Sequence, residues 1–258
     1  MGMMERVPPV GLIDPRHTAR WLVLPLGWHD GNGRAHRDVR VRELTGADEE
    51  ALFDQGQGSG AQKVSAFLAR VIERIDGVDV PIDSGLTASL SLGDRDYLLL
   101  RLRQFELGDA VHQVARCPAC AGKVDVDLLI SELPLRAAPT VAAQFEVRLP
   151  DASLQLRWPN GADQAAIEVL ALANPAAANT RLFSRIVLDI DGRGAPSEDA
   201  VRAWPLARRQ ALAAWLEHRL PGPDLYLDLG CPHCLADMSY AFDLHGFFLP
   251  SAWPAAPG

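Results

Sequence analysis

The sequence lacks a basic surplus. Its 258 residues carry 25 lysines and arginines against 33 aspartates and glutamates, which gives a formal net charge of −8. A general nucleic-acid binder needs a basic face to neutralise phosphates, so this class is disfavoured. The chain also has no apolar run near the roughly 18 residues of a membrane span, and no basic start that leads into an apolar stretch. We therefore expect a soluble protein that is made in the cytoplasm and does not insert into a membrane.

The motifs of common catalytic classes are missing as well. There is no G-x-S-x-G nucleophile elbow, no P-loop, no H-E-x-x-H pair and no G-x-G-x-x-G between a strand and a helix. The seven histidines are dispersed along the chain, so a histidine-based hydrolytic centre has nothing to build on. We expect no enzymatic activity and no small-molecule substrate.

Cysteine is scarce, and its placement is therefore informative. Four cysteines are too few for a disulfide scaffold in a chain of 258 residues. They form two C-P-x-C units at a constant offset of 114 residues. A C-P-x-C turn is typical of a zinc knuckle, and a tetrahedral site needs two such turns. The predicted ligands of one structural zinc ion per chain are Cys117, Cys120, Cys231 and Cys234.

The flanks of the cysteines bear on a second interpretation, because C-x-x-C is also the motif of thiol oxidoreductases, where it opens a helix. Here the flanks alternate between apolar and polar residues as strands do, at 109–116, 122–129, 224–229 and 239–244. Each pair is therefore expected at the tip of a β-hairpin, as in a zinc ribbon. His112 and His233 are near enough to replace a cysteine as ligands, but they are better interpreted as a strand residue and an exposed knuckle residue.

The constant offset extends beyond the cysteines and indicates an internal duplication. Phe67–Gly77 aligns with Leu182–Gly192 at an offset of 115 residues, and Gly46-Ala-Asp48 aligns with Gly161-Ala-Asp163 at the same offset. At an offset of 114 the matched pairs are Leu92 and Leu206, Arg95 and Arg209, Leu98 and Leu212, and Leu102 and Leu216. We predict an α+β fold of two diverged tandem αβ repeats, residues 1–136 and 137–258, each ending in a hairpin with a CPxC knuckle and joined by a shared zinc-ribbon-like site.

Each repeat is expected to contain leading strands, then helices, then the hairpin. In the first repeat the pattern predicts strands over 21–26 and 38–44 and helices near 47–53, 62–75 and 94–105. In the second it predicts strands over 145–149 and 154–158 and helices near 162–173, 180–189 and 205–220. Residues 253–258 are expected to form a frayed tail.

The order of motifs in the first repeat resembles the T-even-phage-type baseplate protein family, whose members occur in contractile phage tails and related extracellular contractile injection systems. The resemblance spans roughly residues 38–135. The residues that carry it are Arg42-Glu-Leu-Thr-Gly46 with Glu49-Glu50, then Leu92-Gly-Asp-Arg-Asp-Tyr-Leu-Leu-Leu-Arg-Leu-Arg103, Phe105, Gly108-Asp109 and Cys117-Pro-Ala-Cys120. The second repeat departs from this pattern, because Ala207 and Arg208 replace Gly93 and Asp94.

The resemblance implies a non-enzymatic structural or assembly component of the baseplate or hub, with other baseplate, hub or tail proteins as partners. It implies a place in the bacterial cytoplasm during assembly and in the assembled phage-tail-like particle. The alternative is a zinc-ribbon adaptor that binds nucleic acid or transcription machinery. Such ribbons display basic and aromatic residues, whereas aspartates crowd these hairpins, at Asp109, Asp125, Asp127, Asp224, Asp228, Asp237 and Asp243.

Overall fold

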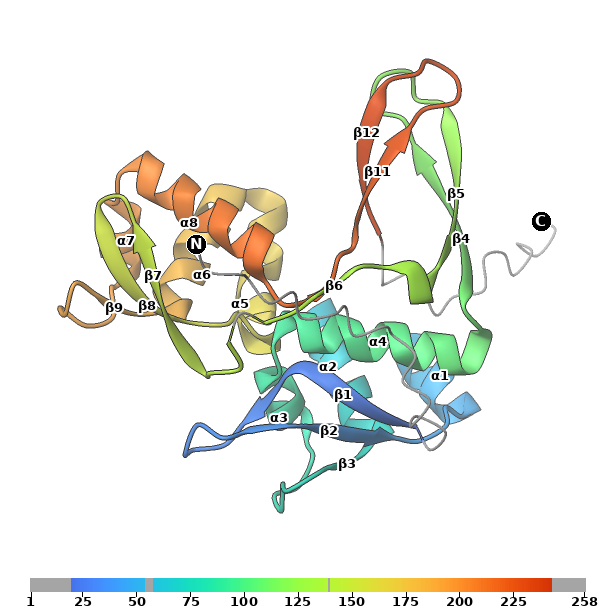
Figure 1. The fold of residues 1–258 in the computed structure, drawn as a ribbon, viewed down its shortest axis with the longest axis horizontal. Helices are drawn as coiled ribbons and strands as arrows, with labels where there is room; N and C mark the ends of the chain where they lie inside the picture. The colour runs from blue at the N-terminus through green and yellow to red at the C-terminus, as the bar shows by residue number, and fades with distance from the viewer. Residues whose placement is uncertain (1–19, 54–57, 139, 243–258) are drawn as a thin grey trace, which may run out of the picture. The chain divides into compact units, whose positions relative to one another are not determined.

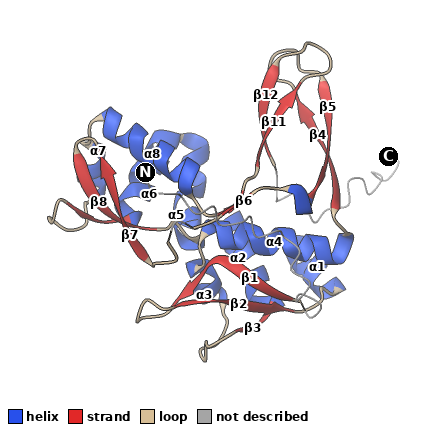
Figure 2. Ribbon diagram, in the orientation of Figure 1, coloured by secondary structure: helices blue, strands red, loops and turns tan. Residues whose placement is uncertain are grey.

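A computed structural model describes residues 20–53, 58–138 and 140–242, so Asp243 and the expected tail at 253–258 lie outside the described residues. Within them the fold is α+β, with eight α-helices and five small sheets (Figure 2). The chain divides into two compact units. The hairpin unit contains residues 96–135 and 223–242, and the body unit contains residues 20–95 and 136–222. The boundary between the predicted repeats at residue 136 remains a prediction.

The first half of the body unit is a three-stranded antiparallel sheet with three helices. Its elements are β1 (Trp21–His29), β2 (Ala35–Val41), α1 (Gly46–Phe53), α2 (Gly60–Val71), β3 (Ile72–Ile75) and α3 (Ser84–Ser89), and the sheet order is β1-β2-β3. Helix α2 begins at a capping box in which Ser59 and Gln62 each bond the other's backbone N–H, and it buries Phe67 and Leu68. Strand β1 alternates only at its start, where Leu22 and Leu24 are buried around an exposed Val23, and residues 24–27 are all buried.

The second half of the body unit has the same order of strands and helices. Its elements are β7 (Gln144–Leu149), β8 (Ala152–Arg157), α5 (Gly161–Ala173), α6 (Pro175–Ile186), β9 (Val187–Ile190), α7 (Glu198–Arg202) and α8 (Leu206–Arg219), and the sheet order is β7-β8-β9. The side chains of Asn160 and Asn174 cap α5 and α6. The apolar core of this half includes Leu154, Phe183 and Leu212.

Two of the predicted helices are wrong at their C-terminal ends. Helices α2 and α6 end at Val71 and Ile186, and the residues that follow form β3 and β9, the third strand of each sheet. The reason is tertiary: Ile75 pairs with Val39 and Ile190 pairs with Leu154, so sheet pairing and burial override the continuing helical pattern. The short helices α3 and α7 were not predicted, because five or six residues give too little periodicity.

Helix α4 (Leu92–Leu107) begins with Gly93 and Asp94, and both residues have structural roles in the body unit. A Cβ at Gly93 would lie 1.6 Å from the carbonyl oxygen of Pro221, so only glycine allows this approach of two backbones. The Asp94 carboxylate is fully buried and accepts the backbone N–H groups of Leu26 and Gly27 at 2.8 and 3.1 Å. Burial raises the pKa of Asp94, and these hydrogen bonds oppose the shift.

The next residue, Arg95, is a buried cross-link. Only 1% of its surface is exposed, and its guanidinium donates to the carbonyl oxygens of Ala61 and Thr87 and to the hydroxyl of Ser65, each at 2.9 Å. Gly161 packs against the same guanidinium, since a Cβ there would lie 2.5 Å from its Cζ. Gly93-Asp94-Arg95 is thus explained by packing within the body unit.

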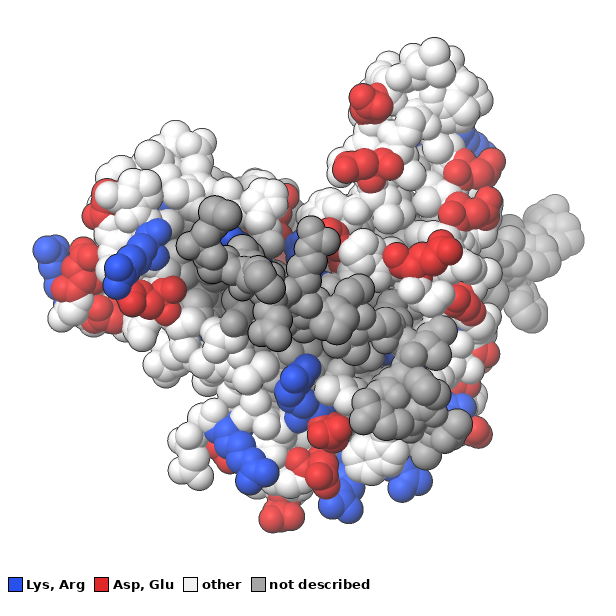
Figure 3. Space-filling model, viewed as in Figure 1, with Lys and Arg blue, Asp and Glu red and all other residues white. Residues whose placement is uncertain are grey.

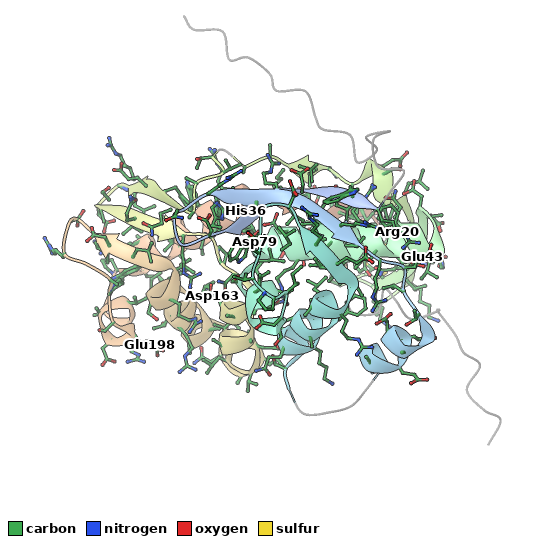
Figure 4. The ribbon with its side chains drawn as sticks, turned by 90° about the horizontal axis from the view of Figure 1, so that it is seen from below. Arg20, His36, Glu43, Asp79, Asp163 and Glu198 are labelled. Atoms are coloured by element: carbon green, nitrogen blue, oxygen red, sulfur yellow. The ribbon has the colours of Figure 1, made fainter. Side chains whose placement is uncertain are left out.

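The body unit holds two buried ion triads of the same form. Each consists of an aspartate near a helix start that is paired with two arginines, one just before the helix and one on the helix that follows. They are Asp48 with Arg42 and Arg70, and Asp163 with Arg157 and Arg185 (Figure 4 labels Asp163). Both aspartate side chains are 0% exposed. The hydrogen bond from Arg42 lowers the pKa of Asp48. Burial tends to raise the pKa of Asp163, but its hydrogen bonds with Arg157 and Arg185, and the positive charge of Arg157, are stronger, so that pKa is lowered as well.

The hairpin unit consists of two β-hairpins beside the later turns of α4 (Figure 1). Its strands and the short 3-10 helix are β4 (Ala110–Arg116), β5 (Lys123–Leu129), η2 (Ile130–Glu132), β11 (Tyr226–Gly230) and β12 (Asp237–Ala241). The two-residue strands β6 (Leu135–Arg136) and β10 (Gly222–Pro223) lie where the chain passes between units. No helix in the described parts of the chain combines the length and apolar character of a membrane span.

The two hairpins pack through their inward faces. One core cluster lies toward the strand ends farther from the turns and includes Val111, Ile130 and Phe242. A second lies next to the turns and contains apolar side chains and two cysteines: Ala115, Cys117, Val124, Val126, Cys231 and Met238. The period-two alternation read from the sequence is therefore confirmed, and it points one face of each hairpin at the other.

Candidate metal centre

The four predicted ligands lie in the turns of the two hairpins, where the strand pattern placed them. Cys117 and Cys120 lie between β4 and β5, and Cys231 and Cys234 lie between β11 and β12. The two turns close by equivalent hydrogen bonds between backbone groups. In the first turn, the N–H of Cys117 donates to the carbonyl oxygen of Gly122, and the N–H of Ala121 donates to that of Cys117. In the second turn, the N–H of Cys231 donates to the carbonyl oxygen of Ala236, and the N–H of Leu235 donates to that of Cys231. All four distances are 2.8–2.9 Å.

The four cysteine sulfur atoms form one cluster. All four Sγ atoms lie within 4.8 Å of one another, and the described residues contain no other such group of three or more possible ligands. Cys117 Sγ lies 3.7 Å from Cys234 Sγ, and Cys120 Sγ lies 3.7 Å from Cys231 Sγ, so both close pairs link different hairpins. These separations exceed a disulfide bond of about 2.0 Å. They match the edge of about 3.8 Å in a tetrahedron of thiolates around an ion with bonds of about 2.3 Å.

The burial of the sulfurs and their hydrogen bonds suit a cation. Cys117 and Cys231 are buried at the core side, whereas Cys120 and Cys234 are exposed. Burial opposes ionisation of Cys231, but the backbone N–H groups of His233 and Cys234 stabilise its thiolate and lower the pKa of Cys231 to about 7. A first negative charge is therefore easily formed at this cluster.

Loss of a proton from a second or third thiol of the cysteine cluster is less favourable. The N–H of Ala236 favours the Cys234 thiolate, but hydrogen bonds to the sulfurs of Cys120 and Cys231 hold the proton and raise the pKa of Cys234 to about 12. The N–H of Gly122 favours the Cys120 thiolate, but hydrogen bonds to the sulfurs of Cys231 and Cys117 leave the pKa of Cys120 raised. A bound divalent cation removes this resistance, because its charge stabilises all four thiolates.

Two contacts between the hairpins were not predicted. The Nε2–H of His233 donates to the carbonyl oxygen of Lys123 at 2.9 Å, and its ring covers Gly122, where a Cβ would lie 2.6 Å from His233 Cδ2. The hydroxyl of Tyr240 donates to Gln113 Oε1 at 2.7 Å. His233 was expected to be merely an exposed knuckle residue; it also fastens one knuckle to the other. A polar residue in an inward strand position, as Gln113 is, was the available signal for the second contact.

His112 does not join the sulfurs. It lies on the outward face of β4–β5, where its Nδ1–H donates to Asp127 at 2.8 Å and its Nε2 lies 3.7 Å from Asp125. The expectation that His112 is an ordinary strand residue agrees with this position. The chemistry of the site therefore belongs to the cysteines alone.

Comparison with known proteins identifies a family over most of the chain. A family model described as T4 bacteriophage base plate protein matches residues 30–249. This range includes all four cysteines and both triads. No curated protein and no solved structure matches the chain.

Proposed function

Because the chain belongs to the family of T4 bacteriophage base plate proteins, we propose that it is a non-enzymatic component of the base plate or hub of a contractile tail or contractile injection system, acting in the structure or in its assembly. Its partners are other base plate, hub or tail proteins. It resides in the bacterial cytoplasm during assembly, and in the particle afterwards where its role is structural. The match over residues 30–249 is the observation that carries this proposal.

We further propose that one zinc ion per chain is bound by Cys117, Cys120, Cys231 and Cys234. Four soft thiolates in a tetrahedron favour zinc over the hard cations. Because cysteines fill all four positions, no position is left for a substrate or an activated water, so the ion is structural. The zinc replaces the large core that these two small hairpins lack.

Equivalent contacts support the proposal of two tandem repeats, residues 1–136 and 137–258. The two triads are related by a constant offset of 115 residues. Arg95 donates to the carbonyl oxygen of Ala61, and Arg209, its counterpart, donates to that of Ala176. The residues after the second cysteine of each knuckle, Ala121 and Leu235, both have a positive φ, of 59° and 61°. Shared packing at constant offset is what a duplication followed by divergence produces.

The two alternative functions have less support. A thiol oxidoreductase places its C-x-x-C at a helix start, whereas both pairs here lie in hairpin turns. A nucleic-acid ribbon needs basic hairpins, whereas residues 224–241, which contain β11 and β12, include three aspartates and no lysine or arginine.

Zinc affinity is expected to fall steeply in acid. Bound thiolates carry no proton, and the pKa values of Cys120 and Cys234 are raised in the metal-free protein. Binding therefore releases at least two protons at neutral pH, and the association constant should fall about 100-fold or more for each pH unit below 7. Competition with a chromophoric chelator between pH 6 and 8 measures this slope. The His112→Gln protein should show the same slope, and a slope below one proton would contradict a four-thiolate site.

The role in assembly is tested by deleting the gene and counting contractile particles by electron microscopy. We expect particles to be absent, to return with the wild-type gene, and to contain or transiently bind the protein. Normal numbers of intact particles in the deletion strain would refute the proposed function. Measuring zinc on the purified protein is a separate test, because the site can exist without this role.

A further inference from the structure

The turn ends of the two hairpins differ in character from the rest of the hairpin unit. We call residues 117–122 and 231–236 together the knuckle tip. Their sequences, C-P-A-C-A-G and C-P-H-C-L-A, contain no aspartate, glutamate, lysine or arginine. The strands below carry mainly acidic side chains, with Arg116 and Lys123 next to the first turn, and Figure 3 shows an end of this unit without acidic or basic side chains above sides that are mostly acidic. Apart from the four cysteines, the knuckle tip therefore has no ionisable acidic or basic side chain of these four types, and most of the charged side chains on the strands that lead to it are acidic.

The knuckle tip carries one large apolar side chain that is exposed. Leu235 is 86% exposed, although a leucine side chain gains free energy when it leaves water. Isolated exposed leucines are common on proteins, so exposure alone decides little. The backbone at this position supplies the second observation.

Leu235 has a φ of 61°, in the left-handed region where a side chain is strained. The turn requires this conformation, because the N–H of Leu235 must reach the carbonyl oxygen of Cys231, 2.9 Å away. The equivalent residue of the first knuckle, Ala121, has the same conformation with a φ of 59°. Glycine would remove the strain at either position. A leucine at position 235 therefore costs stability and returns no buried contact to the fold.

The backbone of Leu235 closes the turn, but its exposed side chain adds strain without a buried contact, and such a side chain suggests a role outside the fold. We propose that Leu235 is the apolar anchor of a docking surface at the knuckle tip, and that it inserts into an apolar socket with a basic rim on another base plate protein. This inference rests on the proposed function for the kind of partner. The anchor is presented on the zinc-closed turn, so the ion sets its direction.

Charge favours a basic protein rim over the other possible occupants. The hairpin that carries Leu235 has Asp228 and Asp237 exposed on its strands and no lysine or arginine. On the other hairpin Asp125 and Asp127 are 73% and 81% exposed, and the basic residues are Arg116 and Lys123. These mainly acidic strands repel both an anionic lipid surface and the same strands of a second copy.

The test compares Leu235→Gly with a matched control, Ala121→Gly. Both changes relieve the same backbone strain in equivalent turns, and only the first removes a large apolar side chain. Both proteins should bind one zinc ion and melt no lower than the wild type, which excludes misfolding as a cause. Each purified base plate protein encoded beside the gene serves as a probe in titrations with the labelled zinc-bound chain.

We expect one of these proteins to bind the wild type and Ala121→Gly with equal Kd, and to bind Leu235→Gly roughly 10- to 100-fold more weakly, the effect of losing one buried leucine. Added salt should weaken binding of all three. Equal binding by Leu235→Gly would overturn the proposal. So would binding of neutral phosphatidylcholine vesicles or self-association through Leu235 with no base plate protein bound.

The same variants separate this inference from the proposed function. If the deletion strain assembles normal particles, the proposed function fails whatever the titrations show. If wild-type protein is required but Leu235→Gly restores particles as well as Ala121→Gly does, the proposed function stands and the docking surface is refuted.

Discussion

Serine in place of Cys231 is expected to abolish metal binding and to unfold the hairpin unit. Cys231 is 1% exposed and belongs to the core cluster beside the turns, so its sulfur is both a proposed ligand and a packing group. Structural zinc contributes about 10–16 kcal/mol in small zinc domains, whereas a whole domain is stable by about 5–15 kcal/mol. The hairpins contribute mainly a small apolar core, and they cannot offset a loss of this size.

The expected readouts are a zinc content that falls from one ion per chain to none, and fast hydrogen exchange throughout β4, β5, β11 and β12. Ala119→Ser is the matched control, because it adds a hydroxyl to an exposed position of the opposite knuckle and leaves all four sulfurs in place. Two ions per wild-type chain, or slow exchange retained by the metal-free Cys231→Ser protein, would contradict a single structural site.

Asparagine in place of Asp163 is expected to destabilise the body unit by about 3 kcal/mol. The carboxylate of Asp163 is 0% exposed and bonds Arg157 at 2.6 Å and Arg185 at 2.7 Å. Removing one member of a buried ion pair costs about 3–5 kcal/mol, because the remaining charge is left without compensation. The arginine side chains are 27% and 39% exposed, so partial solvation places the expected loss at the lower end of that range.

Chemical denaturation monitored by hydrogen exchange in α5 and α6 measures this loss. Asp48→Asn should cost a similar amount in the first half of the body unit, and Asp199→Asn, at an exposed ion pair with Arg202, should cost under about 0.5 kcal/mol.

The stabilisation that Asp163 gives to the fold should depend on pH, because its pKa is lowered in the folded protein. The stabilisation is fully present above the ordinary aspartate pKa of about 4, and it is lost as the pH falls toward the lowered value. The difference between wild type and variant should therefore narrow in acid. A loss that is equal at pH 3 and pH 7 would argue against the ion triad as its cause.

The sequence predicted the features that repeat or alternate. The cysteine spacing located both turns, and the period of two located the strands beside them, because each hairpin buries one face only. The strands at Ile72–Ile75 and Val187–Ile190 were missed, because their burial depends on a sheet partner far away in the chain. Local periodicity carries no information about such a partner.

Most of the polar contacts could not be predicted from the sequence. Arg95 stood out in a motif, but its three acceptors include two backbone carbonyls, which no residue type identifies. His233 was considered as a substitute ligand and interpreted as an exposed knuckle residue; its contact was not predicted, because its acceptor is the backbone of Lys123 on the other hairpin. The pairing of Asp163 with two arginines was foreseeable in principle, since the same three residue types recur 115 positions earlier.

The crossed sulfur pairs also set an order of events in biogenesis. They join residues 117 and 111 positions apart, so the whole second half of the body unit, residues 136–222, lies in the chain between the two halves of the cysteine cluster. Closing a loop of that length costs roughly 4 kcal/mol of chain entropy. The ion can be fully coordinated only after Cys234 has left the ribosome, when the sheets and helices of both body halves have already been synthesised. If the ion is the proposed zinc, its capture is a late step on the nascent chain, and we expect a cell starved of zinc to accumulate chains with a formed body and open hairpins.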